Sequence, residues 1–193
     1  MTFAPLTGLP EVRGSYTENA PLSHLVWFRV GGPAQLLFRP ADTEDLADFL
    51  KNKPADMPVM VLGVGSNMLI RDGGIPGVVI RLPSAFGQVQ AEGTKIVAGA
   101  MALDANVARV AADAGIAGFE FMRGIPGTIG GALTMNAGCH GRELKDVFVS
   151  VTAVTPDGMV QTFGADEMNF VYRKSQVPPG TIFYRNGSGR CCR

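Results

Sequence analysis

Residues 115–141 read GIAGFEFMRGIPGTIGGALTMNAGCHG, and eight of these 27 residues are glycine. Glycine loses more backbone entropy on folding than any other residue, so this density indicates sharp turns, positive φ angles or close approach to a ligand. Glu120 and Arg123 are the only Asp, Glu, Lys or Arg residues in the stretch. The stretch therefore predicts a ligand-binding loop whose donors are mostly backbone N–H groups. A run of purely structural turns is the alternative.

The composition is typical of a globular protein with a sizeable core. Of 193 residues, 46% are hydrophobic and 18% charged, and the net charge is zero. No basic patch indicates nucleic-acid binding, and no apolar run reaches the roughly 18 residues of a membrane helix. The N-terminus lacks the pattern of a secretory signal. Three cysteines and two histidines form neither a disulfide framework nor a zinc motif, which predicts a cytoplasmic protein without a metal site.

The first half of the chain predicts a β-β-α-β-loop-β order after an irregular or partly helical lead-in at residues 1–23. The elements expected are strands at 25–30 and 35–39, a helix from Asp42 to before Pro54, and strands at 59–62 and 78–80. Gly31-Gly32-Pro33 predicts that the first two strands are adjacent and antiparallel. Asp42 is the expected N-cap, with Glu44 and Asp45 in the first helical turn.

The second half repeats the mixture of strands and helices. The elements expected are a strand at 95–98, a helix at 103–114, a strand at 147–154 paired with 159–163, and a short helix at 165–168. Residues 132–135 are either a strand or the end of a short helix that begins near Thr128. The predicted class is α+β in two lobes, 1–84 and 85–183, followed by an atypical tail at 184–193 that continues no strand or helix.

A second glycine-rich loop, GVGSN at 63–67, follows a predicted strand. Met68 stands where a dinucleotide fingerprint needs its third glycine, and no Walker Gly-Lys-Ser/Thr follows. Consecutive N–H groups in such a turn can still hold an anion, and Ser66 and Asn67 add neutral donors suited to a pyrophosphate. A plain turn is the alternative. Together with residues 124–131, the loop suits one elongated ligand. Because the sequence shows no catalytic triad, the chemistry is expected to come from a cofactor.

The chain resembles the UDP-N-acetylenolpyruvoylglucosamine reductases, the MurB family, with matching motif order from about residue 22 to 183. The segments that carry the resemblance are GVGSNML at 63–69 with Asp72 and GVVI at 77–80, GFEF at 118–121 with GIPGTIGG at 124–131 and NAG at 136–138, and FVYRKS at 170–175, which is similar to a Y-R-x-S segment. The resemblance implies the two-lobed FAD-binding fold of the vanillyl-alcohol-oxidase (PCMH) type, whose lobes hold FAD between them.

The resemblance also implies the site residues. Arg173 is the expected catalytic cation near the substrate carboxylate, since its planar fork suits a carboxylate, and Tyr172 is expected to contact substrate. Ser175 is expected to orient Arg173. The cofactor-binding residues implied are Gly63, Val64, Gly65, Ser66, Asn67, Met68, Leu69, Gly118, Gly124, Ile125, Pro126, Gly127, Thr128, Gly130, Gly131, Asn136, Ala137 and Gly138.

The implied activity is NADPH-dependent reduction of UDP-N-acetylglucosamine enolpyruvate to UDP-N-acetylmuramate, a cytoplasmic step of peptidoglycan precursor synthesis, by a monomer. FAD is expected to bind non-covalently, although the wider fold includes covalent attachment through residues of the type of Cys139 and His140. The family has a third, substrate-binding domain with a proton-donating Ser and a late Glu. A chain ending at Arg193 without them is expected to be truncated, with an out-of-frame tail. The alternatives are a non-catalytic FAD-binding fragment or another flavin oxidoreductase of the same fold.

Overall fold

The computed structural model describes residues 2–188, with the backbone alone at 186–188, and divides into two compact units. The first unit comprises residues up to Pro83 together with Val154–Met159, and the second comprises Ser84–Ala153 and residues from Val160 onward. The sequence placed residues 154–159 in the second lobe. They belong to the first unit because their turn packs on a helix there: a Cβ at Gly158 would lie 2.5 Å from the Ala47 carbonyl oxygen.

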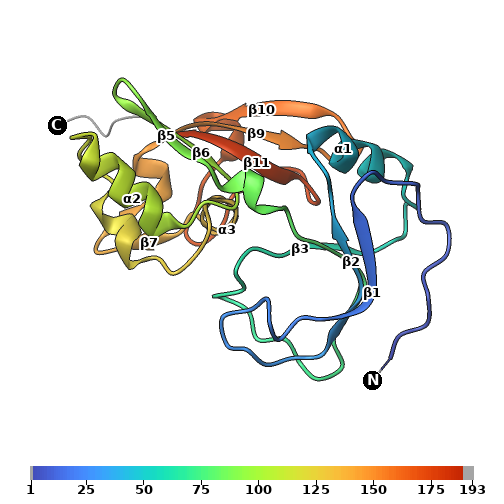
Figure 1. The fold of residues 1–193 in the computed structure, drawn as a ribbon. Helices are drawn as coiled ribbons and strands as arrows, with labels where there is room; N and C mark the ends of the chain where they lie inside the picture. The colour runs from blue at the N-terminus through green and yellow to red at the C-terminus, as the bar shows by residue number, and fades with distance from the viewer. Residues whose placement is uncertain (1, 189–193) are drawn as a thin grey trace. The chain divides into compact units, whose positions relative to one another are not determined.

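The first unit contains one four-stranded sheet and one helix (Figure 1). Its elements are β1 (Ser15–Pro21), β2 (Pro33–Arg39), α1 (Thr43–Asn52), β3 (Val59–Val61) and β4 (Ile75–Ile80). The strand order is β1-β2-β4-β3; β1 is antiparallel to β2, whereas β2 and β3 both run parallel to β4.

The predicted strand at 25–30 is wrong, because these residues form successive turns. Leu25 N–H donates to the Leu22 carbonyl at 2.8 Å, and Arg29 N–H donates to the Val26 carbonyl at 3.2 Å. Leu22 and Val26 are buried, whereas Trp27 is 60% exposed, so burial follows turn spacing and not strand alternation. The antiparallel partner of β2 is β1, inside the stretch expected to be irregular.

Helix α1 confirms the predicted N-cap, since the Asp42 carboxylate accepts the Asp45 N–H at 2.9 Å. Phe49 on its buried face packs on Phe38 of β2, with ring centroids 4.6 Å apart. Asp45 is buried, and its carboxylate binds backbone outside the helix. The three N–H donors are those of Arg13 at 2.7 Å, Gly14 at 2.9 Å and Ala41 at 2.8 Å. Asp45 therefore fastens the N-terminal segment and the entry to α1 together.

The second unit packs its helices on a five-stranded sheet of order β10-β9-β11-β6-β5. The strands of this sheet are β5 (Val89–Glu92), β6 (Lys95–Gly99), β9 (Phe148–Val154), β10 (Val160–Gly164) and β11 (Ile182–Ser188). The short strands β7 (Gly138–Cys139) and β8 (Arg142–Glu143) pair with each other in a separate two-stranded sheet. The helices of the unit are α2 (Asp104–Asp113), α3 (Ile129–Met135) and α4 (Ala165–Met168), with 3₁₀ turns at Ser84–Gly87, Glu120–Gly124 and Leu144–Asp146. Residues 132–135 thus take the helical alternative.

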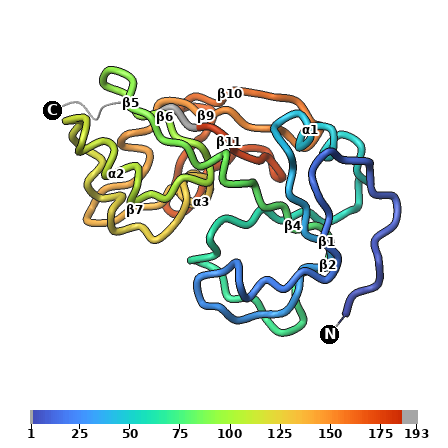
Figure 2. The backbone as a smooth tube through the Cα atoms, viewed as in Figure 1, coloured from blue at the N-terminus to red at the C-terminus, as the bar shows by residue number. Residues whose placement is uncertain are grey.

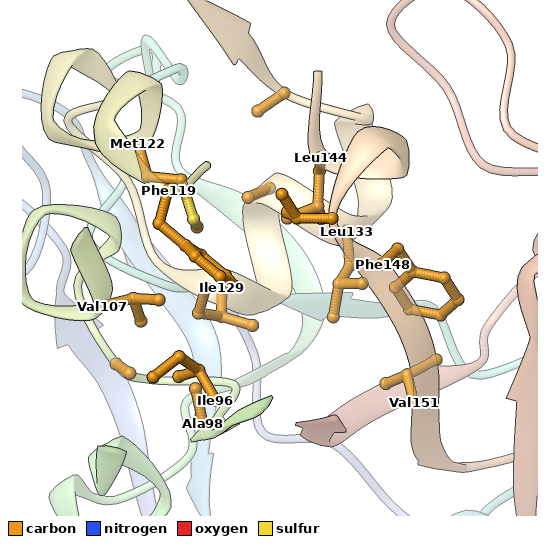
Figure 3. Packing of buried hydrophobic residues seen from close by; sticks show 14 of the residues in the cluster. Ile96, Ala98, Val107, Phe119, Met122, Ile129, Leu133, Leu144, Phe148 and Val151 are labelled. Atoms are coloured by element: carbon orange, nitrogen blue, oxygen red, sulfur yellow. The ribbon is translucent and has the colours of Figure 1, made fainter. Parts of the chain in front are cut away.

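The core of this unit joins the glycine-rich segment to the sheet (Figure 3). Ile129 and Leu133 of α3 are fully buried and contribute to one cluster with Phe119 from the segment, Ile96 of β6 and Val151 of β9. Because its apolar side chains are anchored in this cluster, the segment is held in place despite its glycine content. Figure 2 traces its path from the end of α2 through α3 to β7. Within residues 2–188, no helix has the length and hydropathy needed to cross a membrane.

The expected absence of structure in the tail is wrong for residues 184–188, which belong to β11. This strand pairs antiparallel with β6, placing Arg185 opposite Gly99 and Ser188 opposite Ile96. Phe183 is buried and anchors the strand in the core. Strand pairing here overrides a glycine-containing, polar sequence. Residues 189–193 lie outside the part of the chain that the structure describes.

Candidate functional site

The glycine-rich segment uses some of its backbone donors within the protein. Ile129 N–H donates to the Ala102 carbonyl at 2.9 Å, and Gly130 N–H donates to the Ala100 carbonyl at 2.8 Å. These bonds tie the start of α3 to the link between β6 and α2. The amide of Gly130, expected to contact the cofactor, is therefore committed to this internal bond.

Four of the predicted cofactor-binding glycines in this segment differ in why the structure has glycine there. Gly138 is required by packing, since a Cβ would lie 2.4 Å from the Arg142 carbonyl oxygen, and Gly124 is crowded by a side chain, since a Cβ would lie 2.6 Å from Cys139 Sγ. Gly118 is required by its φ of +101°, a value that strains other residues. None of these causes applies to Gly131. In the described part of the chain, a Cβ there would meet one neighbour beyond its own helix backbone, Thr128 Oγ1 at 3.9 Å.

The remaining predicted residues of the segment differ in exposure. Pro126 and Gly131 are exposed, Ile125, Gly127 and Gly138 are half-buried, and Thr128 and Ala137 are buried. Thr128 also bridges to Leu103 at the start of α2. Glu120 acts as a local acceptor: Gly118 N–H donates to both its carboxylate oxygens, at 3.0 and 3.1 Å. This bond is the main cause that lowers the pKa of Glu120, so the residue is a structural anion here.

Asn136 is fully buried at the C-terminal end of α3, in a left-handed conformation with φ +40°. Its Nδ2 donates to Glu143 Oε2 at 2.9 Å and to the Val171 carbonyl at 3.1 Å. Its Oδ1 accepts the Lys145 N–H at 3.1 Å. Asn136 was expected to contact the cofactor, yet these bonds direct its side chain to two other parts of the chain, residues 143–145 and Val171.

The predicted catalytic pair lies on a tight turn. Val171 and Lys174 exchange backbone hydrogen bonds of 2.9 and 3.2 Å, and Arg173 between them has a φ of +56°. Tyr172 is 81% exposed, and the Arg173 guanidinium carbon lies 5.8 Å from its ring centroid. Both side chains are accessible to a ligand. The turn is followed by buried Ser175.

Charge near this turn is organised around Glu143. A 2.7 Å ion pair with Lys145 is the largest cause that lowers the pKa of Glu143, followed by the Asn136 hydrogen bond, with a smaller contribution from the positive charge of Arg173. Ser175 binds the other side of the turn to α3, donating its N–H and its hydroxyl to the Thr134 carbonyl at 3.0 and 3.3 Å. Ser175 thus supports the conformation around Arg173.

The other predicted loop, residues 63–69, lies in the first unit after β3. Gly65 has a φ of +61°, and a Cβ on it would lie 2.6 Å from Val26 Cγ1, so both conformation and packing require glycine there. Asn67 and Leu69 are exposed, the latter by 74%. The members of the loop that are half-buried are Gly63, Val64, Ser66 and Met68.

Sequence reasoning missed Asp104, the first residue of α2. Its side chain is fully buried, and its backbone N–H donates to the Gly127 carbonyl at 3.1 Å, beside the glycine-rich segment. Neither carboxyl oxygen has a hydrogen-bond partner among the described residues, and burial raises the pKa to about 7. An aspartate at a helix start normally indicates an exposed cap, so the sequence carries no sign of this burial.

Residues 34–164 match the family described as FAD binding domain. The chain belongs to the FAD-binding domain family. It is 55% identical over 175 residues to the UDP-N-acetylenolpyruvoylglucosamine reductase of Azorhizobium caulinodans, covering 91% of this chain and 57% of that protein. The chain spans less than two thirds of the length of this relative. The resemblance predicted from the motifs is confirmed.

Solved structures agree with this assignment. The UDP-N-acetylenolpyruvylglucosamine reductase (MurB) from Thermus caldophilus superposes with a TM-score of 0.77 at 34% identity, over 93% of this chain and 64% of that one. The 6-hydroxy-D-nicotine oxidase from Arthrobacter nicotinovorans, at 16% identity, shares the fold with a TM-score of 0.62 over 93% of this chain and 43% of that one. The predicted α+β FAD-binding fold is therefore confirmed.

The residues present fit the FAD that the family binds. Gly131 is exposed and free of side-chain crowding, so a ligand can approach the backbone there. Ser66 and Asn67 place neutral polar groups after β3 in the first unit. Each unit thus has a glycine-containing loop with exposed residues, Asn67 in the first and Gly131 in the second.

Proposed function

We propose that the chain carries the FAD-binding domain of a UDP-N-acetylenolpyruvoylglucosamine reductase, which uses NADPH to reduce UDP-N-acetylglucosamine enolpyruvate to UDP-N-acetylmuramate. The reaction belongs to cytoplasmic peptidoglycan precursor synthesis. The observation that carries the proposal is the bonding of the turn bearing Tyr172 and Arg173 to the end of the glycine-rich segment through Asn136. The reductases related in sequence support the choice of reaction.

FAD, when bound, supplies the hydride transfer that protein side chains cannot perform. The role proposed for Arg173 is to hold the substrate carboxylate and stabilise negative charge that develops next to it. Its guanidinium offers a planar pair of donors for this purpose. Tyr172 contacts the substrate from the same exposed turn, and Ser175 keeps the turn in place through Thr134.

Cofactor binding is proposed to be non-covalent and to depend mainly on backbone groups. Residues 63–69 and the surface around Gly131 contact the cofactor, whereas Gly124, Gly130 and Gly138 shape the backbone. Cys139 is a free thiol in the second unit, and its Sγ would lie 2.6 Å from a Cβ built on Gly124. The thiol thus lies beside the backbone of the glycine-rich segment, and the proposal gives it no bond to flavin.

Spectroscopy of the purified chain tests the proposal in steps. We expect a visible flavin band, bleaching of that band by NADPH under anaerobic conditions, and its return when the UDP-sugar enolpyruvate is added. Arg173→Ala should keep the first two responses and slow the third by about 100-fold or more, as for the loss of a charge-stabilising group. Absence of flavin after incubation with FAD would reject the proposal. Bleaching without return would show a flavin-binding protein that lacks the reductase activity.

A further inference from the structure

The carboxamide of Asn136 is placed where three parts of the second unit meet. The residue has no solvent exposure, and both Nδ2 protons have acceptors, on Glu143 and on the Val171 backbone. Oδ1 accepts from the Lys145 backbone. A buried amide with these partners cannot reorient without leaving polar groups unpaired. Asn136 therefore fixes the Val171 carbonyl relative to the end of α3.

The turn that this bond holds is under local strain. Arg173 is a non-glycine residue in the left-handed region, with a φ of +56°. Such conformations persist where the surrounding bonds determine them. Two backbone bonds close the turn between Val171 and Lys174, the bond to Asn136 attaches its start to the end of α3, and Ser175 attaches its other side through Thr134. Loss of the Asn136 bond should release the start of the turn and raise the fraction of molecules in which the turn is open.

Helix α3 links this anchor to the exposed glycine of the proposed cofactor site. It has seven residues, Ile129–Met135, with Gly131 near its start and Asn136 as its C-cap. Helices this short depend on tertiary contacts for their stability. A ligand that orders the beginning of α3 will also stabilise its end, and with it the Asn136 bonds.

We infer that Asn136 is a positioning residue, which couples occupancy of the glycine-rich segment by FAD to the order of the turn that carries Arg173. The inference rests on the proposed function for the identity of the ligand and of the catalytic residue. Linkage requires the coupling to be reciprocal: FAD stabilises the turn, and an ordered turn strengthens FAD binding. Asn136 acts through the Val171 backbone and needs no contact with either molecule.

Asn136→Gly removes the side chain but keeps the backbone conformation, because glycine adopts positive φ without strain. The substitution therefore measures the effect of losing the side-chain bonds alone. Asn169→Gly is the matched control. Asn169 is also a left-handed C-cap, with φ +40° after α4, but it is exposed and its Nδ2 donates to Gln176 Oε1 at 2.9 Å. Both substitutions replace a left-handed asparagine with glycine, but only Asn136→Gly removes a buried side chain that holds the turn.

Trypsin cleavage after Arg173 and Lys174, followed by mass spectrometry with and without added FAD, measures the opening of the turn. Cleavage tracks the open population when opening is fast. We expect about tenfold faster cleavage in Asn136→Gly, as for loss of a buried anchor, and an unchanged rate in Asn169→Gly. FAD should slow cleavage in the wild type and in Asn169→Gly, and have little effect in Asn136→Gly.

Equal cleavage of the two variants without FAD would overturn the anchoring role, and equal protection by FAD would overturn the coupling. If the wild type binds no FAD, the proposed function fails, while the comparison without FAD still decides whether Asn136 anchors the turn. Asn136→Asp provides a second variant should Asn136→Gly not fold. It keeps the acceptor for the Lys145 N–H and removes the Nδ2 donor, so it should also open the turn.

Discussion

Replacing Asp104 with asparagine should stabilise the second unit above neutral pH and leave its stability nearly unchanged in acid. The Asp104 carboxyl is buried without a partner among the described residues, and burial raises its pKa from 3.8 to about 7. The folded protein therefore keeps this proton to a higher pH than the unfolded chain. Stability is greatest below the unfolded pKa and falls as the pH rises toward 7, above which the loss is complete.

The size of the stability change follows from the interval between the two pKa values of Asp104, unfolded and folded. At roughly 1.4 kcal/mol for each pH unit, raising the pH from 3.8 to about 7 removes about 4 kcal/mol from the free energy of unfolding. The start of α2 favours an anion by about 0.5 kcal/mol, and this offsets a small part of the loss. Asparagine has nearly the same shape and does not ionise. Asp104→Asn should therefore be more stable than the wild type by about 3.5 kcal/mol near pH 8.

Urea unfolding followed by far-ultraviolet circular dichroism, repeated between about pH 4 and pH 8, measures the effect. Asp113→Asn is the control, since Asp113 ends the same helix but is exposed and paired with Arg109 at 2.9 Å. Trp27, the single tryptophan, lies in the first unit, so its fluorescence follows that unit separately. Parallel pH profiles for the wild type and Asp104→Asn would refute the reasoning, as would equal effects of the two substitutions.

Three further substitutions test other parts of the structure. Gly131→Ala should raise stability by up to about 1 kcal/mol through helix propensity and weaken FAD binding by crowding the backbone, which thermal unfolding and flavin titration measure separately; tighter binding would contradict the proposed contact. Asp45→Ala should lower the free energy of unfolding by about 3 kcal/mol, because three backbone N–H groups lose their acceptor; exposed Asp48→Ala serves as the control, and equal effects in urea would reject the explanation. Gly124→Ala places a Cβ 2.6 Å from Cys139 Sγ and should cost about 1–3 kcal/mol, whereas an unchanged thermal midpoint would show that the contact relaxes freely.

Local patterns were sufficient wherever neighbouring residues decide the structure. Asp42 precedes an amphipathic run, and α1 begins after it as expected. The strand expected at 147–154 and its expected partner at 159–163 are the neighbouring strands β9 and β10 of the structure. The long glycine-rich segment was specific enough to indicate the family, because its glycines, asparagine and spacing occur together.

Predictions from the sequence were insufficient where contacts between residues far apart in the chain determine the structure. Residues 25–30 have the composition of a strand, but Leu22 and Val26 enter the core at turn spacing, and the backbone there forms turn bonds instead of pairing with the sheet. Gly124 and Gly131 look alike in sequence, yet Cys139 crowds the first and nothing comparable crowds the second. The family resemblance assigned Asn136 to cofactor binding, and the sequence carried no sign that its side chain bonds to Val171, 35 residues later.

The first unit is discontinuous, and this affects the order in which it can form during synthesis. Its sheet and α1 are complete once Pro83 has been made, but Gly158, which packs against Ala47 and Lys51, arrives only after residues 84–153. Closing so long a segment of chain carries an entropic cost that local contacts do not. A ribosome-bound chain shorter than Val154 therefore lacks the turn that packs on Ala47 and Lys51 of α1 in the folded protein.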